Sequence, residues 1–287
     1  MQPFNDLKFD IAIPDSYLFG VKTDVDKTLK VFQLSRALSI FSINNINIYH
    51  DKVLNPSNYE RKFLSTILEY LDTPQYLRRK IYPRSDILNE VGRLHPIRSP
   101  HHKDKVDLKN LKSGEIRVGL VERKEGQFYV DVGLESLIKY EGKFRQSGKK
   151  INVKLIRQNK QVVGVDVKDD ELSNLFWGYS VHYFTDLKKI MERYDPTTII
   201  LTSRYSRYFD EAELSSIGRK ELDTNNIMLV VFGSPKYGLD VIFDREGLDL
   251  KKYNSYNFFP KQGTQTVRLE EAIFGVLSIL NFYVKRY

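Results

Sequence analysis

The stretch that decides the fold of this chain is Phe258–Glu271, with the sequence FFPKQGTQTVRLEE. It is a polar loop with one glycine, and it leads directly into the apolar segment Leu269–Tyr283, which has the length of an ordinary helix. A similar loop, Phe232–Gly238, follows the apolar run Ile227–Val231. Loops of Gly, Ser, Thr and Gln that end strands can offer many backbone N–H and C=O groups to a small polar ligand. The sequence therefore predicts a cofactor site formed by these two loops.

The composition limits the class of protein. The chain has 287 residues, enough for one large domain or two ordinary ones, and its 41% hydrophobic content predicts a folded protein. It has no cysteine, which excludes disulfides and thiolate zinc sites. No apolar run reaches the roughly 18 residues of a membrane span, and we expect a soluble cytoplasmic protein without membrane partners. A net charge of +8 favours an acidic partner.

The first part of the chain has the pattern of an α/β fold. Apolar runs predict strands at Phe9–Ile13 and Ile46–Tyr49. A helix capped by Thr23 or Asp24 is expected to run to about Phe41, a second helix covers Tyr59–Leu71, and a short third helix ends near Ile81.

The first of these helices is apolar on two opposite sides. At about 100° per residue, one row holds Val25, Leu29, Phe32 and Ile40, and the opposite row holds Val31, Leu34, Leu38 and Phe41. A helix with two apolar faces is expected to be covered on both, between a sheet and another layer. Arg36 falls in the first row, where a long cation needs a partner. It is either a structural ion pair, a side chain that reaches to solvent, or an arginine at a site where substrate, phosphate or base approaches.

Residues 87–170 lose the helical pattern and read as short strands with tight turns. Gly114–Val121 and Gln127–Val132 flank Lys124-Glu125-Gly126, which is a hairpin signal. Ile151–Ile156 and Val162–Val167 repeat the pattern around Gln158-Asn159-Lys160. The segment is expected to form a small β-barrel of the OB type.

After Glu171 the α/β pattern returns. We expect strands at Ser180–Phe184, Thr198–Thr202 and Ile227–Phe232, with helices at Asp186–Tyr194 and Phe209–Leu222 between them. The fold class is therefore α/β, with one domain over residues 1–86 and 171–287 and an inserted OB-like β-barrel over residues 87–170.

Positive charge is concentrated in the predicted barrel. Residues 87–170 hold 18 lysines and arginines against 12 acids, an excess of six. Gly142–Val165 contains no acid and seven cations: Lys143, Arg145, Lys149, Lys150, Lys154, Arg157 and Lys160. Such a run can be merely a solvated face, but its place in a barrel type that often binds oligonucleotides favours a surface that follows RNA phosphates.

Common catalytic motifs are missing. The chain has no Gly-x-Gly-x-x-Gly, no Gly-x-x-x-x-Gly-Lys-Ser/Thr and no Gly-x-Ser-x-Gly. His95, His101 and His102 do not have the spacing of a zinc protease and lack a matching carboxylate pattern. We expect no metal site and interpret these histidines as hydrogen-bonding or RNA-facing groups at the domain junction.

Several motifs together resemble one family. They are the Lys27–Arg36 helix, the strand end Thr202-Ser203-Arg204, Gly233-Ser234-Pro235-x-x-Gly238, the Asn257–Ala272 segment with Gln262-Gly263-Thr264-x-Thr266-Val267-Arg268, and the junction Leu94–His102. Together they resemble the SPOUT class of methyltransferases, within it the archaeal and eukaryotic group of RNA uridine-N3 methyltransferases. The resemblance covers nearly the whole chain, barrel included, although Phe258, Phe259 and Lys261 replace smaller residues often found in this loop.

The resemblance implies a trefoil-knotted domain, an unusual exception to the rule that chains do not thread through their own loops. It also implies a homodimer whose sites are completed across the interface, with Arg36 at the position of a functional arginine and Arg268 contacting RNA or closing the knot. S-adenosylmethionine is expected in the knot, bound by three loops whose matching residues are Thr202, Ser203, Arg204, Gly233, Ser234, Pro235, Gly238, Asn257, Phe258, Pro260, Gln262, Gly263, Thr264, Thr266 and Val267.

The function predicted from these observations is S-adenosylmethionine-dependent methylation of RNA, either rRNA or tRNA, at N3 of a uridine in rRNA by the family resemblance. The alternative is a knotted dimer that binds RNA or a ribosome-assembly intermediate with little activity. A methyltransferase that acts on protein is disfavoured by the basic barrel. No general base is identifiable from the sequence.

Overall fold

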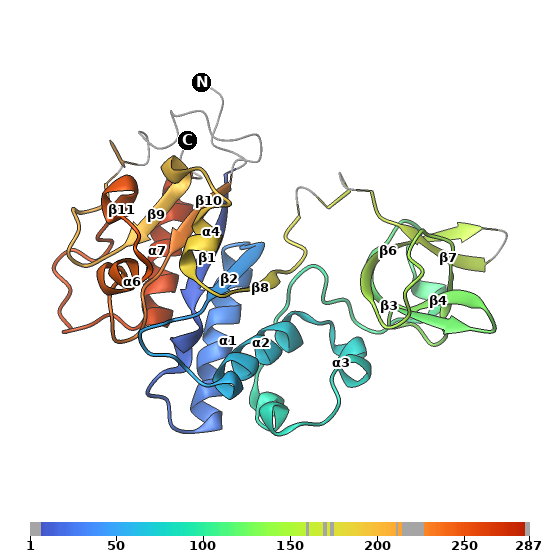
Figure 1. The fold of residues 1–287 in the computed structure, drawn as a ribbon. Coiled ribbons are helices and arrows are strands. Elements are labelled where there is room, and N and C mark those ends of the chain that lie inside the picture. The colour runs from blue at the N-terminus through green and yellow to red at the C-terminus, as the bar shows by residue number, and fades with distance from the viewer. Residues whose placement is uncertain are drawn as a thin grey trace. The chain divides into compact units, whose positions relative to one another are not determined.

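The computed structural model describes residues 7–158, 161–168, 171–172, 175–210, 212–213 and 227–284. Contacts between Cα atoms divide the chain into two compact units (Figure 1). The first consists of Met1–Glu69, Glu90–Leu94 and Tyr179–Tyr287, and the second of Tyr70–Asn89 and His95–Gly178.

The first unit is built on a parallel sheet of six strands in the order β11-β9-β10-β1-β2-β8. The strand bounds are β1 Lys8–Pro14, β2 Asn45–Tyr49, β8 Ser180–Phe184, β9 Ile199–Thr202, β10 Ile227–Val231 and β11 Asn254–Tyr256. The central strands are apolar on both faces, as strands covered by helices on both sides are. All strands predicted for this unit are confirmed, and β11 was not predicted.

The helices that join these strands are α1 Asp24–Ile40, α2 Asn58–Asp72, α4 Leu187–Met191, α6 Leu239–Glu246 and α7 Leu269–Val284. Single 3₁₀ turns lie at Asp15–Leu18, Val91–Arg93, Pro196–Thr198 and Leu250–Lys252. Helix α4 is shorter than the predicted Asp186–Tyr194, with the Asp186 side chain accepting a capping hydrogen bond from Lys189 N. Of the helix predicted at Phe209–Leu222, Phe209 and Asp210 are not helical, Ala212 and Glu213 are helical, and the remainder lies outside the described residues.

One face of the sheet packs against α4 and α6, and helices α1 and α7 contact each other. The core between the sheet and these two helices includes Leu229, Val231, Leu187 and Phe243, all buried. Tyr49 crosses this layer, and its hydroxyl donates to Phe232 O at 2.7 Å. The strand ends of β2 and β10 are thereby connected.

The prediction that α1 is covered on both faces is correct for only one face of the single chain. Val31, Leu34 and Leu38 are buried against the unit, whereas Leu29 is 45% exposed and Ile40 is 47% exposed. The physical reason is that no element of the described chain covers the row that holds Leu29 and Ile40. The apolar character of that row is therefore unexplained by the monomer.

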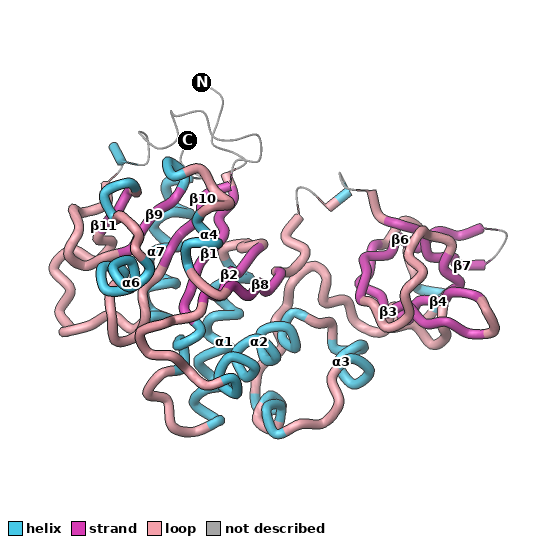
Figure 2. Tube along the Cα trace, in the orientation of Figure 1, coloured by secondary structure: helices cyan, strands magenta, loops and turns pink. Residues whose placement is uncertain are grey.

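The second unit contains a closed barrel of five strands in the order β3-β4-β5-β7-β6 (Figure 2). The strands are β3 Ile116–Lys124, β4 Gln127–Asp131, β5 Ile138–Tyr140, β6 Lys150–Gln158 and β7 Gln161–Asp166. Its core consists of alternating residues of these strands, such as Val121, Val130, Val153 and Leu155. The predicted β3–β4 hairpin is present, with Glu125 at φ 49° and Gly126 at φ 80°, the left-handed pair that a tight hairpin turn needs.

Helix α3, Gln75–Ile81, belongs to the same unit as the barrel. Leu77 packs against Val118 and Leu120 of β3, and the Tyr76 hydroxyl donates to Val118 O at 2.6 Å. Short 3₁₀ turns at Asp86–Leu88 and Leu108–Asn110 complete the unit. The barrel therefore carries a helical attachment that the sequence did not assign to it.

Among the helices that the structure describes, none is both long and apolar enough to cross a membrane. Within the same residues, no cluster of three or more histidine, aspartate or glutamate side chains is placed to hold a metal ion.

Candidate functional site

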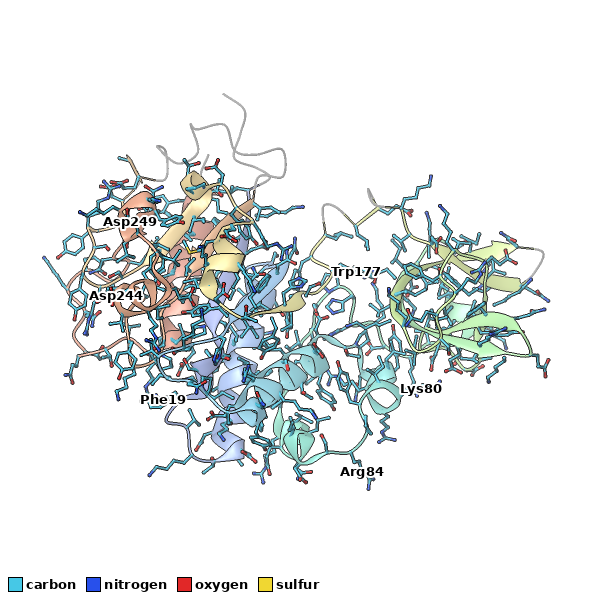
Figure 3. All side chains as sticks on the ribbon, viewed as in Figure 1. Phe19, Lys80, Arg84, Trp177, Asp244 and Asp249 are labelled. Carbon is cyan, nitrogen blue, oxygen red and sulfur yellow. The ribbon has the colours of Figure 1, made fainter. Side chains whose placement is uncertain are left out.

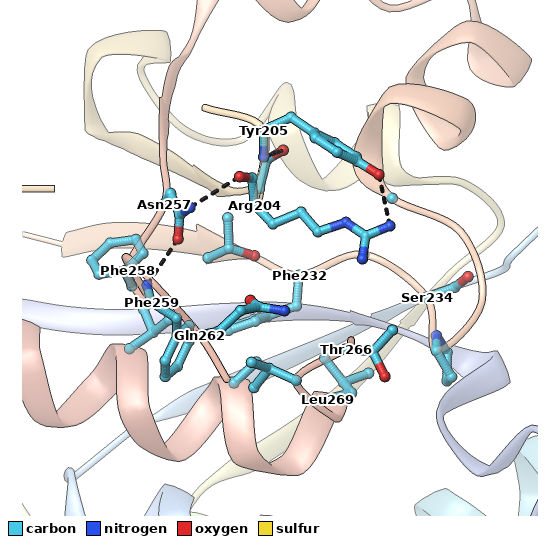
Figure 4. Close-up of a pocket in the computed structure, with 18 of the residues that line it drawn as sticks. Arg204, Tyr205, Phe232, Ser234, Asn257, Phe258, Phe259, Gln262, Thr266 and Leu269 are labelled. Atoms are coloured by element: carbon cyan, nitrogen blue, oxygen red, sulfur yellow. Dashed lines mark hydrogen bonds between the residues drawn. The ribbon is translucent and has the colours of Figure 1, made fainter. Parts of the chain in front are cut away.

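The carboxyl ends of β9, β10 and β11 lie at one edge of the sheet, because the strands are parallel and adjacent. Thr202 is in register with Tyr256, so the loops that follow β9 and β11 begin side by side. These loops and the one after β10 surround a cavity of about 200 Å³ (Figure 4). Three segments that are far apart in the sequence thus form one site.

Most of the residues predicted to bind a cofactor line this cavity. The lining includes Thr202, Ser203, Arg204, Gly233, Ser234, Pro235, Gly238, Asn257, Phe258, Gln262, Thr266 and Val267. Pro260, Gly263 and Thr264 are in the same loop but are not among the lining residues.

Five further lining residues, Phe232, Lys236, Tyr237, Phe259 and Leu269, lie in the two predicted loops but were not named as cofactor-binding residues. The sequence prediction missed Tyr205, Tyr256, Ala272 and Val276. For the α7 residues a signal was available, since positions 269, 272 and 276 have the spacing of one helical face. The aromatic residues carried no such signal, because their roles depend on how the loops fold.

Asn257 joins two of the three loops. Its side-chain amide donates to Arg204 O at 2.9 Å, and its side-chain oxygen accepts from Phe259 N at 2.8 Å (Figure 4). The residue is only 9% exposed, so both backbone groups would lose their partner without it. Asn257 therefore fixes the loop after β9 against the loop after β11.

Arg204 makes a second connection across the cavity. Its guanidinium donates to Gln265 O at 3.0 Å and to the Tyr205 hydroxyl at 2.6 Å, and it lies 4.7 Å from the centre of the Tyr205 ring. These contacts hold the end of the β11 loop close to the end of β9.

The loop after β10 is closed on itself. Ser234 N donates to Tyr237 O at 2.9 Å, and Tyr237 N donates to the Ser234 hydroxyl at 2.9 Å. A Cβ on Gly233 would lie 3.1 Å from Tyr237 O and 3.2 Å from Leu239 N, so glycine permits the tight approach. The turn ends at Gly238, which caps α6.

Hydrogen bonds within the loop after β11 set its path. The Gln262 amide donates to Thr264 O at 2.9 Å and to Gln265 O at 3.3 Å, and the Thr264 hydroxyl donates to Thr266 O at 3.0 Å. Thr264 thus supports the loop without lining the cavity. The loop ends where Arg268 N donates to the Glu271 carboxylate at 2.9 Å, at the start of α7.

Aromatic rings and α7 form the apolar part of the cavity. Phe258 is buried and stacks on Phe209 with ring centres 4.6 Å apart. A Cβ on Gly275 would lie 2.5 Å from two ring atoms of Phe259, so the ring sits directly on the helix backbone. Glycine at this position lets Phe259 reach the cavity wall.

The described residues that line the cavity include the cations Arg204 and Lys236 and no carboxylate. Tyr256 is also neutral at ordinary pH: burial raises its pKa to about 12, and its hydrogen bond to Glu213 at 2.9 Å adds to the rise. The cavity can thus hold a ligand by neutral polar groups and apolar contact but supplies no proton acceptor from these side chains.

Arg36 does not line this cavity. It is half-buried on α1, and within the described part of the chain it has neither an ion pair nor a side-chain hydrogen bond. The structural ion pair considered from the sequence is therefore not found there. A single chain does not bring Arg36 to the site.

The cations predicted to bind RNA fall into two groups within the second unit. Lys154 pairs with Glu171 and holds the pKa of that carboxyl below its usual value, Lys150 lies 3.5 Å from Asp72, and Arg157 donates to Leu108 O at 2.9 Å. Lys143, Arg145 and Lys149 make no ion pair with an acid among the described residues. Arg268, in the first unit, is exposed at the start of α7.

The histidines make local hydrogen bonds. His101 and His102 both point Nε2 at Asp72 O, at 2.8 and 2.9 Å, and burial lowers the pKa of His102. His50 bonds the buried Asp15 carboxylate at 2.8 Å, and His95 is exposed. These contacts agree with the hydrogen-bonding interpretation of His101 and His102.

Known proteins resemble the chain over nearly its whole length. A protein-family model described as "Putative RNA methyltransferase" matches residues 8–280. The chain belongs to this family. Methyl transfer, the reaction that gives this family its description, requires a methyl donor.

Relatives come from animals and archaea. A 28S rRNA (uridine-N(3))-methyltransferase of Drosophila melanogaster is 26% identical over 96% of this chain, and the chain spans 62% of that protein's length. The human 28S rRNA (uridine-N(3))-methyltransferase is 28% identical, over 94% of this chain and 77% of its own length. An uncharacterized protein of Haloarcula marismortui is 26% identical over 94% of this chain and 97% of its own length.

Proposed function

We propose that this protein is an S-adenosylmethionine-dependent RNA methyltransferase that acts at N3 of a uridine in rRNA. The observation that carries the proposal is the convergence of the loops after β9, β10 and β11 on one cavity. Membership of an RNA methyltransferase family and the activity named for the animal relatives support the reaction and the target.

The donor set of the cavity fits S-adenosylmethionine. Phe232, Leu269 and Val276 offer an apolar wall suited to a nucleobase, and the side chains of Thr202 and Gln262 lie beside it as hydrogen-bonding groups. Two cations, Arg204 and Lys236, suit a carboxylate. Bound there, the cofactor would supply a methyl group already activated on a sulfonium.

The chain itself must align the acceptor nitrogen and favour loss of its proton. The N3–H of uracil is a weak acid, and negative charge develops on O2 and O4 when the proton leaves. Arg36, a cation without a partner in the described chain, would stabilise that charge. The described lining residues supply no carboxylate, so in this proposal the N3 proton passes to water, and positioning and charge stabilisation carry the reaction.

We also propose that the protein is a homodimer paired through α1 and α7. Leu29, Ile40, Phe274 and Phe282 are between 45% and 59% exposed, and Phe274 packs edge-on against Phe41 with ring centres 5.3 Å apart. Such apolar residues on two touching helices form the kind of surface that a second copy covers. Arg36 is in the same helical row as Leu29 and Ile40, so pairing through this face would bring it to a neighbouring site.

The proposal includes the knotted SPOUT fold and the OB-like barrel. The order of the parallel sheet, with three functional loops at one edge, supports the first. The barrel's antiparallel β3–β4–β5 meander and the parallel pairing of β5 with β7 support the second.

An assay of methyl transfer tests the function. Purified protein, isotope-labelled S-adenosylmethionine and rRNA should give label in the RNA, and nucleoside mass spectrometry should identify 3-methyluridine. Arg36→Ala should lose most of the transfer, with cofactor affinity by calorimetry unchanged, while Arg36→Lys should retain part of it. No transfer to any cellular RNA together with no cofactor binding would refute the catalytic proposal, and RNA binding without transfer would favour a binding factor.

A further inference from the structure

The loop between β5 and β6 carries an exposed aromatic ring. Phe144 is 42% exposed, and Lys149 Nζ lies 5.1 Å from its ring centre. Its neighbour Arg145 lies 5.3 Å from the ring centre of Phe128, and Arg123 lies 5.8 Å from the same ring. The hairpin end of β3 and β4 and the β5–β6 loop therefore present two aromatic rings with three cations.

This loop is held in place at both ends. On one side, Lys143 N donates to the Asp166 carboxylate at 2.9 Å, and the Tyr140 hydroxyl bonds the other oxygen of that carboxylate. On the other side, Gly148 N donates to Val121 O at 2.8 Å. The ring of Phe144 is thus presented by a loop whose backbone is already fixed, which lowers the entropy lost on binding.

The position of Gly142 supports this view of the loop. A Cβ at Gly142 would collide with the Asp166 carboxylate and with the Tyr140 hydroxyl. Only glycine lets the chain pass this close to the pair that anchors Lys143 and Phe144. The glycine at position 142 is therefore what the anchored conformation of this loop requires.

Three other predicted RNA-binding cations of the barrel have side-chain contacts with the protein. Lys150 and Lys154 face Asp72 and Glu171, and Arg157 is bound to backbone carbonyls. Arg145 donates to the backbone oxygens of Gly142 and Phe144, but like Arg123 and Lys149 it has no acidic partner among the described residues. Asp166, the acid nearest to Phe144 in the groove lined by Lys143, Phe144, Val167 and Lys168, has both oxygens engaged. Three cations that make no ion pair among the described residues therefore lie beside the two rings.

We propose that Phe144, with Lys149 and Arg145 beside it, is a stacking site for one unpaired base of an RNA strand. Every base has a face that can stack on an aromatic ring, and neighbouring cations neutralise the flanking phosphates. A protein partner would call for a wider apolar surface, whereas here each ring is bordered by cations. The proposal rests on RNA as the substrate of the proposed function and adds that the barrel requires a single-stranded segment.

The test measures binding of a fluorescently labelled single-stranded RNA oligonucleotide by anisotropy, over a series of salt concentrations and without methyl donor. Phe144→Ala should weaken binding by about 10-fold, because stacking of one base is lost. The slope of log affinity against log salt should stay unchanged, since the ring releases no counterions. Phe144→Trp should bind as well as the wild type.

Phe19→Ala is the matched control, because Phe19 lies in the first unit outside the cavity and is 44% exposed, almost as much as Phe144. It should leave RNA affinity unchanged. Fluorescence of Trp177, the single tryptophan and part of the barrel unit, checks that each variant is folded (Figure 3).

Wild-type affinity in a folded Phe144→Ala variant, or an equal loss of affinity for an RNA duplex of the same length, would overturn the stacking site. Because binding is measured without methyl donor, a failure of methyl transfer would leave this result standing. Normal methyl transfer by Phe144→Ala would support the proposed function. Whether Phe144 stacks on a base would still be decided by the RNA-binding data alone.

Discussion

The cavity at the end of the sheet and the outer end of the barrel are built in opposite ways. In the cavity, Asn257 and Arg204 connect the loop after β9 to the loop after β11, and the described lining has two cations and no acid. At the barrel end, rings and cations such as Phe144 and Lys149 face outward with their charge uncompensated. Fixed neutral donors select a ligand by shape, whereas unpaired cations attract a polyanion of almost any sequence.

This difference separates the tasks that the two regions can perform. A cavity that depends on short hydrogen bonds should bind its ligand with little dependence on salt, and it should fail when its loops shift. A cationic surface should lose affinity steeply as salt rises but tolerate the loss of one contact. Substitutions in the cavity and in the barrel should therefore have different effects on cofactor binding and on RNA binding.

The largest effect is expected from Asn257→Ala. The substitution leaves Arg204 O and Phe259 N without partners in a partly buried site, at a cost of about 1 kcal/mol for each group. We expect calorimetry to detect no binding of S-adenosylmethionine and the transfer assay to detect no product. RNA affinity by anisotropy should match the wild type, and a parallel loss of RNA binding would show that the two regions are not separable.

A pair of glycine substitutions tests the aromatic wall of the cavity. Gly275→Ala places a methyl group 2.5 Å from Phe259, and the overpacking should destabilise the protein by about 1–3 kcal/mol and weaken cofactor binding. Gly263→Ala is the control, because a Cβ there meets nothing within 4 Å. Calorimetric unfolding should give a lower Tm for the first variant only. Equal Tm values would mean that Phe259 does not pack on α7 as described.

Substitutions of two lysines in the barrel test whether a lysine that is paired with an acid contributes less to RNA binding than an unpaired lysine. Lys149→Gln removes a cation without an acidic partner and should lower the slope of log affinity against log salt by about one, with an affinity loss of a few-fold at low salt. Lys154→Gln removes a cation paired with Glu171 and should change the slope less. Equal slopes for both variants would contradict the division of the barrel cations into two groups.

The cations also show the limit of the sequence prediction. Lys149 and Lys154 lie in the same acid-free stretch, Gly142–Val165, and no feature of the sequence distinguishes them. The acid that pairs with Lys154 is Glu171, which lies outside that stretch, and the fold alone brings the two together. The run of positive charge therefore predicted a basic surface on the barrel, but it could not show which lysines and arginines are free of an acidic partner.

The fold was predictable where the pattern was long and regular. Apolar runs located β1, β2, β8, β9 and β10, whereas β11 and β5 have three residues each and too little pattern to be recognised. The glycine-containing polar loops predicted the cavity. Phe259 lines it because the ring packs on Gly275, and Tyr205 lines it beside the Arg204 guanidinium. Such pairings follow from tertiary packing, which a single sequence does not display.

The smallest effect concerns the anchor of the barrel loop. Tyr140→Phe removes the hydrogen bond from the Tyr140 hydroxyl to Asp166 and should cost about 0.5–1.5 kcal/mol at pH 7. Burial, helped by the Asp166 bond, raises the pKa of Tyr140 to about 12 from an ordinary value of 10. A raised pKa means that the folded state holds this proton more tightly than the unfolded state does. The wild type therefore loses stability as pH rises from 10 toward 12, and the phenylalanine variant does not lose this contribution.

Urea unfolding followed by Trp177 fluorescence at pH 7 and pH 11 measures this difference in the barrel unit, to which the single tryptophan belongs. The gap in unfolding free energy between the two proteins should narrow by about 1 kcal/mol at the higher pH. The other tyrosines titrate in both proteins and cancel in the comparison. A gap that stays constant would show that Tyr140 does not share its proton with Asp166, and the loop that carries Phe144 would then lose one of its two anchors.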